Sequence, residues 1–104
     1  MKLDDKIRSR KIAYLLKREP SLAFELALLY YILAKRRTAE DKIKDACLKS
    51  LCWLKKAEIN IPEDIKQLDS SVQLERIEKM LVDNKAKACP WAGTLVRAYC
   101  LASA

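Results

Sequence analysis

The residue types that most often carry out chemistry in proteins are scarce or badly spaced in this chain. There is no histidine, and the four cysteines stand at positions 47, 52, 89 and 100 without forming a CxxC pair. Structural zinc sites commonly use such closely spaced pairs, and general bases near neutral pH are most often histidines. A cysteine nucleophile would also lack its common histidine partner. We therefore expect no bound metal, no cofactor and no enzymatic activity.

Neighbouring acidic residues are a second place to look for chemistry. They occur as Asp4-Asp5, Glu40-Asp41 and Glu63-Asp64. Each pair falls at the start of a predicted helix, where carboxylates stabilise the positive end of the helix dipole. The single glycine of the chain cannot build either a dinucleotide-binding loop or a Walker loop. The residues left to carry a function are the basic ones.

The basic residues are concentrated in the first three-fifths of the chain. Residues 1–61 contain fifteen Lys or Arg against eight Asp or Glu, whereas residues 62–104 contain six of each, so the whole net charge of +7 lies in the first part. Such an excess favours anionic partners, namely nucleic acid, an acidic protein or an anionic surface. The alternative is a solvated lysine-rich face that serves solubility alone.

Their spacing places many of these cations on common helix faces. In a helix over about Leu3–Arg18, four cations share an arc of about 80°, and in a helix from about Thr38 to Glu58 three lysines recur every seven residues beside a tryptophan. A basic triplet follows the helix between them. Cations for phosphate and an indole for a base are what single-stranded nucleic acid binding needs. The predicted contact residues are Lys2, Lys6, Arg10, Lys17, Lys35, Arg36, Arg37, Lys42, Lys49, Trp53 and Lys56.

Each of these patterns also has a purely structural interpretation. The triplet at 35–37 complements the negative end of the preceding helix dipole. Trp53 could close the edge of the core, with the lysines beside it simply solvated. Both interpretations stay open at the level of sequence.

The segment Leu22–Ala34 must organise the fold around it. Its only charge is Glu25, so a helix over about Pro20–Arg37 has no polar face and has to be buried nearly all round. Small residues at 23, 27 and 34 line one side and would let a neighbouring helix approach closely. Glu25 is expected either at the surface or paired with a cation such as Arg36.

The other helices are expected to cover this central one. Ile12, Leu15 and Leu16 share the apolar arc of the first helix. Pro20, Pro62 and Pro90 are each expected in the first turn of a helix, where a missing N–H costs nothing. The remaining helices are predicted over about Pro62–Leu68, Ser71–Asp83 and Pro90–Leu101, and Thr38 and the Ser70–Gln73 pair read as capping signals. The prediction is an all-α fold: residues 1–104 form a single helical domain, a compact bundle of five or six helices.

The apolar segments predict the cellular setting. The start MKLDDKIRSR has no signal-peptide hydrophobic core, and Leu22–Ala34 is shorter than the roughly 20 apolar residues that span a bilayer. We therefore expect a cytoplasmic protein that does not bind membranes. Its cysteines are then expected to be free thiols, with tertiary disulfides as the alternative.

Together these features predict a small, basic, non-enzymatic subunit. It would pack against other protein subunits and contact the nucleic-acid backbone without reading its sequence, and its apolar C-terminal helix would allow self-association. The alternative is a protein-only interaction module, an adaptor or inhibitor, that binds an acidic partner surface. In size, helicity and basic charge, though not in any motif, the chain resembles the small helical subunits of nucleoprotein machines, including those of CRISPR effector complexes.

Overall fold

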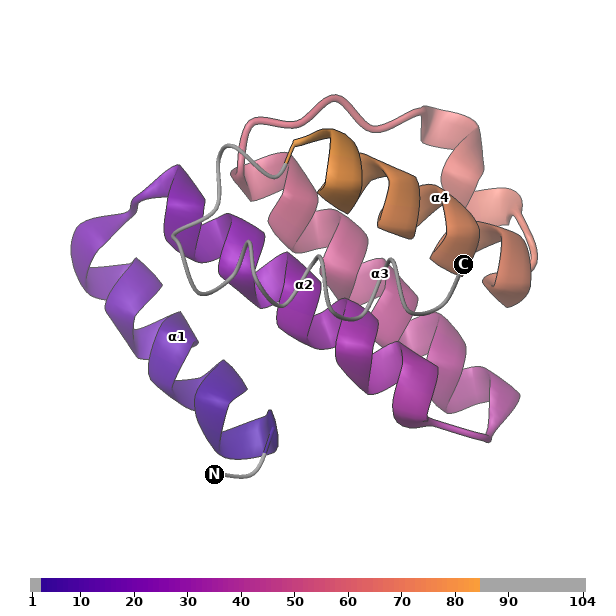
Figure 1. Ribbon diagram of the computed structural model, residues 1–104, viewed down its shortest axis with the longest axis horizontal. Helices are drawn as coiled ribbons and strands as arrows, with labels where there is room; N and C mark the ends of the chain where they lie inside the picture. Colours follow the sequence, from indigo (N-terminus) through magenta and orange to yellow (C-terminus); the bar gives the residue numbers. More distant parts are fainter. Residues whose placement is uncertain (1–2, 85–104) are drawn as a thin grey trace.

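The computed structural model describes residues 3–84, and within this range the chain is helical and contains no strand. The elements are α1 (Leu3–Lys17), α2 (Pro20–Arg36), α3 (Glu40–Lys56), the 3-10 helix η1 (Glu63–Gln67) and α4 (Ser70–Asp83) (Figure 1). The all-α class is confirmed. The described part holds four α-helices, so the predicted bundle of five or six helices is not confirmed. The helix expected over 90–101, and the self-association assigned to it, lie outside the described residues.

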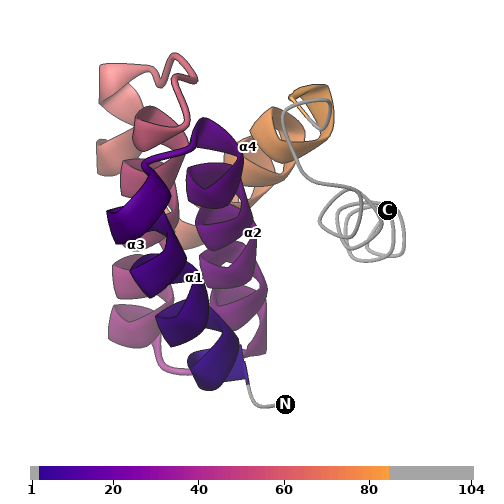
Figure 2. The same cartoon turned by 90° about the vertical axis from the view of Figure 1, so that its left-hand side faces the viewer.

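The near-apolar helix is the centre of the fold, as predicted. All residues of α2 from Ala23 to Ile32 are buried, and α2 packs against α1, α3 and α4. Figure 2 shows α1 in front of α2 and α3, and it is α2 against which α1 packs. A helix with no polar face is stabilised on every side that is removed from water. The other helices therefore pack around it.

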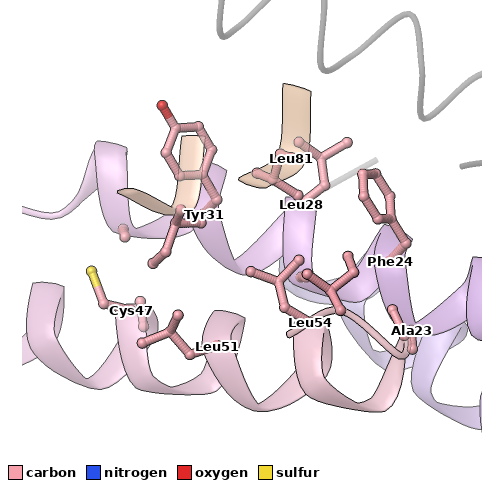
Figure 3. Packing of buried hydrophobic residues seen from close by; sticks show 14 of the residues in the cluster. Ala23, Phe24, Leu28, Tyr31, Cys47, Leu51, Leu54 and Leu81 are labelled. Carbon is pink, nitrogen blue, oxygen red and sulfur yellow. The ribbon is translucent and has the colours of Figure 1, made fainter. Parts of the chain in front are cut away.

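The closest packing is between α2 and α3. Ser50 is fully buried on α3, and its hydroxyl donates a hydrogen bond of 2.7 Å to the carbonyl oxygen of Ala27. Small side chains at this contact let the two helices approach, which supports the role predicted for the alanine side of α2. Figure 3 shows Leu51 and Leu54 of α3 directed toward α2, with Leu81 contributed by α4.

The predicted capping boxes are wrong. The N-cap of α3 is Ala39 rather than Thr38, α4 begins at Ser70, and neither N-cap makes a side-chain capping bond. The Ser70 hydroxyl instead donates to Glu40 Oε1 at 2.6 Å, and Gln73 Nε2 donates to the carbonyl oxygen of Ile65 at 2.9 Å. Both side chains are buried, so they join α4 to α3 and η1, and the motif that suggested local capping serves tertiary packing.

The prolines follow the prediction at one of the two described positions. Pro20 occupies the first turn of α2. Pro62 is the N-cap of η1 and precedes its first turn. Pro90 lies outside the described residues.

Two helices end without glycine through residues in the left-handed region. Arg18 has φ 55° after α1, and Glu58 has φ 66° after α3. At Glu58 the backbone N–H of Ile59 bonds to the carbonyl of Leu54, and that of Glu58 bonds to the carbonyl of Lys55. This is the Schellman arrangement that satisfies the last carbonyls of a helix. A chain with one glycine thus still stops its helices sharply.

The face of α1 that packs on the bundle differs from the expected one. Ile7 is buried, and Leu3 and Tyr14 pack beside it. Ile12, Leu15 and Leu16 are 55%, 62% and 80% exposed. Their shared arc therefore points away from α2.

Glu25 explains this orientation of α1. Its side chain is 3% exposed, and its Oε2 lies 2.9 Å from Nε of Arg10 on α1. Arg36 is eleven residues further along α2, about 16 Å at 1.5 Å per residue, so the partner suggested by sequence is far along the same helix. A buried carboxylate needs a compensating cation, and α1 turns the face that carries Arg10 toward it.

Candidate functional site

A cleft with a volume of about 510 Å³ separates α1 from α3, and α2 forms its floor. The bottom of the cleft is closed by Tyr30 of α2, together with Ile7 of α1 and Ala46 of α3. Each of these three residues is less than 7% exposed. Charged side chains from the two flanking helices and from the α2–α3 connection form the walls. The lining residues are Asp4, Ile7, Arg8, Lys11, Tyr30, Leu33, Arg37, Lys42, Asp45, Ala46 and Lys49.

Two lysines from opposite walls each lie close to the same aromatic ring. Nζ of Lys11 lies 5.3 Å and Nζ of Lys49 lies 5.8 Å from the centroid of Tyr30. The negative face of a phenol ring attracts ammonium groups at this range. Lys49 also pairs with Asp45 one turn earlier on α3, at 3.1 Å. Both ammonium groups thus lie within 6 Å of one ring centroid, and the Asp45 carboxylate accompanies Lys49.

The charge of the cleft as a whole is strongly positive. Five of its lining residues are Lys or Arg, and two are Asp. A concave surface with low-dielectric walls and one dominant sign of charge focuses the field and concentrates counter-ions. The chemistry of this lining, with its excess of cations, suits an anion. Within residues 3–84 there is no group of three Cys, Asp or Glu residues placed to hold a metal ion.

Beyond the cleft the same two helices come into contact through aromatic rings. The rings of Tyr14 on α1 and Trp53 on α3 meet edge-on with centroids 5.1 Å apart. Nζ of Lys56 lies 4.3 Å from the Trp53 ring centroid, and the half-buried indole packs against both core clusters. Trp53 thus closes the edge of the core, and Lys56 already occupies its exposed face, so little of the ring remains for stacking a base.

The structure brings together only some of the predicted contact residues. Arg37, Lys42 and Lys49 line the cleft, and Trp53 and Lys56 continue the same side of α3. Lys35 and Arg36 are exposed at the end of α2, and Nζ of Lys35 lies 5.8 Å from the Tyr31 ring. Lys2 lies outside the described residues.

The predicted stripe on α1 lies on the other flank of that helix. At 100° per residue, Lys6, Arg10 and Lys17 are about 60–100° to one side of buried Ile7, whereas the cleft residues Lys11 and Arg8 are about 40–100° to the opposite side. The two predicted basic stripes therefore do not form one surface. Arg10 is drawn to Glu25, and Lys17 is exposed.

Among the cations of the cleft, Arg8 and Lys11 were not predicted from the sequence. The signal that could have found them is the spacing of Leu3, Ile7 and Tyr14, which at i, i+4 and i+11 defines an alternative inward face for α1. On that face Arg8 and Lys11 are at the edge. The stronger apolar cluster at 12, 15 and 16 concealed this pattern.

No family model, curated protein or solved structure matches this chain. No helix within residues 3–84 has both the length and the hydropathy required to cross a membrane.

The two described cysteines should differ sharply in reactivity. Both are free thiols, Cys47 buried and Cys52 exposed. Burial, aided by the negative charge of Glu40, raises the pKa of the Cys47 thiol from 9.0 to about 11. At pH 8 about one in a thousand Cys47 groups is then the reactive thiolate. Brief labelling with a maleimide followed by peptide mapping should modify Cys52 and leave Cys47 unmodified until the protein unfolds.

The same shift predicts a loss of stability in alkaline solution. The pKa of Cys47 is higher in the folded protein than in the unfolded chain, so only the unfolded chain loses this proton between about pH 9 and pH 11. The free energy of unfolding is therefore unaffected by this group below about pH 9 and decreases as the pH rises toward 11. Rapid labelling of Cys47 in the folded protein at pH 8 would contradict its burial.

Proposed function

We propose that this protein is a small, non-enzymatic basic subunit that packs in a protein assembly and contacts the backbone of nucleic acid. The observation that carries the proposal is the cleft between α1 and α3, where five cations face two carboxylates. The negative charge of phosphodiester groups would balance this excess of cations. Binding of this kind is dominated by phosphate contacts and depends strongly on salt.

The residues of the cleft favour contact with phosphate over the reading of bases. Its walls offer ammonium and guanidinium groups, which are donors to phosphate oxygens. Its floor is closed, because Tyr30 is 4% exposed, and Trp53 is covered by Lys56. An open aromatic platform for stacking is therefore not part of the site. We therefore expect the protein to select polymers that carry phosphate groups and to show little preference for base sequence.

A second candidate function has support from the outer face of α1. Ile12, Leu15 and Leu16 present an exposed apolar ridge, and all charged residues between positions 8 and 18 are basic. Exposed apolar patches with a polar surround often mark contacts with other proteins. In the assembly model this ridge is where a neighbouring subunit packs. As the alternative, ridge and cleft together would bind an acidic protein surface, and nucleic acid would play no part.

The decisive experiment is a matched pair of charge-neutralising variants on α3. The test variant is Lys42→Gln with Lys49→Gln, both at the cleft. The control is Lys44→Gln with Lys55→Gln, which are exposed residues about 120–160° around the same helix from the cleft lysines. Both variants lose two charges. Fluorescence anisotropy of labelled single-stranded and double-stranded DNA and RNA is measured from low to moderate salt.

The test variant is expected to bind at least tenfold more weakly at low salt. Its plot of log affinity against log salt should be less steep by about 1.4, since each lost contact to a single strand removes about 0.7 from the slope. The control should keep both affinity and slope. Equal weakening in both variants would mean that net charge alone attracts the nucleic acid. No binding by the unmodified protein at low salt would reject the proposal and leave the protein-only alternative.

A further inference from the structure

We propose that the cleft receives the end of a nucleic-acid single strand, with its terminal phosphate between Lys11 and Lys49. This inference rests on the proposed function and narrows it from nucleic-acid backbone in general to strand ends that carry a phosphomonoester. Three properties of the cleft carry it: one end is closed, the other end is open and basic, and the pair of lysines lies at the closed end.

The closed end follows from the register of α1 and α3. The two helices run in the same direction, since Lys11 and Lys49 share the ring of Tyr30, and one turn further along each chain Tyr14 meets Trp53. The rings stand 5.1 Å apart. No residue that lines the cleft lies beyond Lys11 on α1 or beyond Lys49 on α3. The two aromatic side chains therefore block this end.

The opposite end is lined by three cations and by one exposed carboxylate, Asp4 in the first turn of α1. Arg37, which follows the last residue of α2, and Lys42, in the first turns of α3, are both exposed and both line the cleft. Arg8 lies on the facing wall. A strand that enters here passes three cations before it reaches Lys11 and Lys49. It cannot continue in the same direction, because the Tyr14–Trp53 contact stands in its path.

The charge at the closed end suits a terminal phosphate better than an internal one. An internal phosphodiester carries one negative charge, whereas a phosphomonoester near neutral pH carries close to two. Two ammonium groups lie within 6 Å of one ring centroid there, and Asp45, which pairs with Lys49, is the single carboxylate beside them. A dianion placed between the two walls can accept a charge-assisted hydrogen bond from an ammonium group on each wall, Lys11 on α1 and Lys49 on α3. A paired duplex end is wider than one strand and fits a cleft between two helices less well.

The test compares oligonucleotides that differ only at their ends. One single-stranded sequence with an internal label is prepared with a 5′-phosphate, with a 3′-phosphate and with hydroxyls at both ends, and the 5′-phosphorylated strand is also used as a blunt duplex. The unmodified protein should bind one of the phosphorylated single strands about tenfold more tightly than the hydroxyl strand, and more tightly than the duplex. In Lys11→Gln with Lys49→Gln this preference should disappear.

Two control variants and one competitor make the result specific. Lys44→Gln with Lys55→Gln should keep the preference and the affinity, and circular dichroism should show that all variants retain the helical content of the unmodified protein. Lys42→Gln alone should weaken binding of the phosphorylated strand and of the hydroxyl strand by the same factor, so the ratio of the two affinities should not change. A mononucleotide with a 5′-phosphate should displace the strand only at a concentration far above that of the unlabelled phosphorylated strand.

The outcomes separate this inference from the function on which it rests. Equal affinity for phosphorylated and hydroxyl strands would overturn strand-end binding and leave backbone contact in place. Equal displacement by mononucleotide and strand would also overturn it, because the site would then take small phosphomonoesters. Absence of binding to any strand would reject the proposed function itself.

Discussion

Replacing Leu54 with alanine is expected to lower the free energy of unfolding by about 3–4 kcal/mol. The Leu54 side chain is completely buried in the larger core cluster, on the face of α3 that packs against α2. Its truncation removes apolar contacts and leaves a cavity beside a helix that cannot move inward, since α2 is packed against three other helices. Urea unfolding followed by circular dichroism measures this loss.

The matched control is Leu48→Ala, the same change on the same helix. Leu48 is 45% exposed, so its truncation leaves no closed cavity and is expected to cost less than about 1 kcal/mol. Equal losses for Leu48 and Leu54 would contradict the orientation of α3. They would mean that the face carrying Leu48 is covered in solution by another surface.

The second large effect is expected at the ion pair between α1 and α2. Arg10→Met should destabilise the protein by about 3 kcal/mol, because it leaves the buried carboxylate of Glu25 without this cation. The value is placed at the lower end of the usual range because the Arg10 side chain is 36% exposed. The experiment compares thermal unfolding of this variant with that of Arg8→Met, an equivalent change at an exposed position of α1.

A compensating variant tests the physical reason. Arg10→Met combined with Glu25→Leu removes both charges and replaces them with apolar groups, so most of the lost stability should return. Arg8→Met should cost well under 1 kcal/mol. If the double variant is as unstable as Arg10→Met, the loss comes from the packing of the arginine stem, and uncompensated charge is not its cause.

These two variants also report on how the cleft is built. α1 forms one wall of the cleft, and Ile7 is its one buried side chain. Few apolar contacts therefore hold this helix to the bundle. A variant that loosens α1 should therefore weaken anion binding even though Arg10 does not line the cleft. The orientation of Arg8 and Lys11 on α1 therefore depends on the Glu25 carboxylate, which is buried on α2 and pairs with Arg10 on the other flank of α1.

The sequence by itself was enough to predict where the helices run. Predicted ends at Arg18, Arg37 and Asp83 differ from the observed ends at Lys17, Arg36 and Asp83 by no more than one residue. The end predicted at Glu58 lies two residues beyond the observed end of α3 at Lys56. The central position of α2 was also predictable. Helix formation depends on contacts within a few residues of chain, and proline, charge and apolar period are all local signals. A segment without a polar face has one low-energy place in water, which is the interior.

Only the tertiary structure decided which faces meet. The apolar arc at 12, 15 and 16 favoured one orientation of α1, but the buried Glu25 required a cation, and the pairing with Arg10 turned α1 the other way. Ser70 and Gln73 likewise found partners 30 and 8 residues away instead of capping their own helix. The cleft is a consequence of the orientation of α1, because this orientation places Arg8 and Lys11 opposite Lys42 and Lys49. A buried polar group is satisfied by whichever partner the whole fold brings near, and no local period in the sequence specifies that partner.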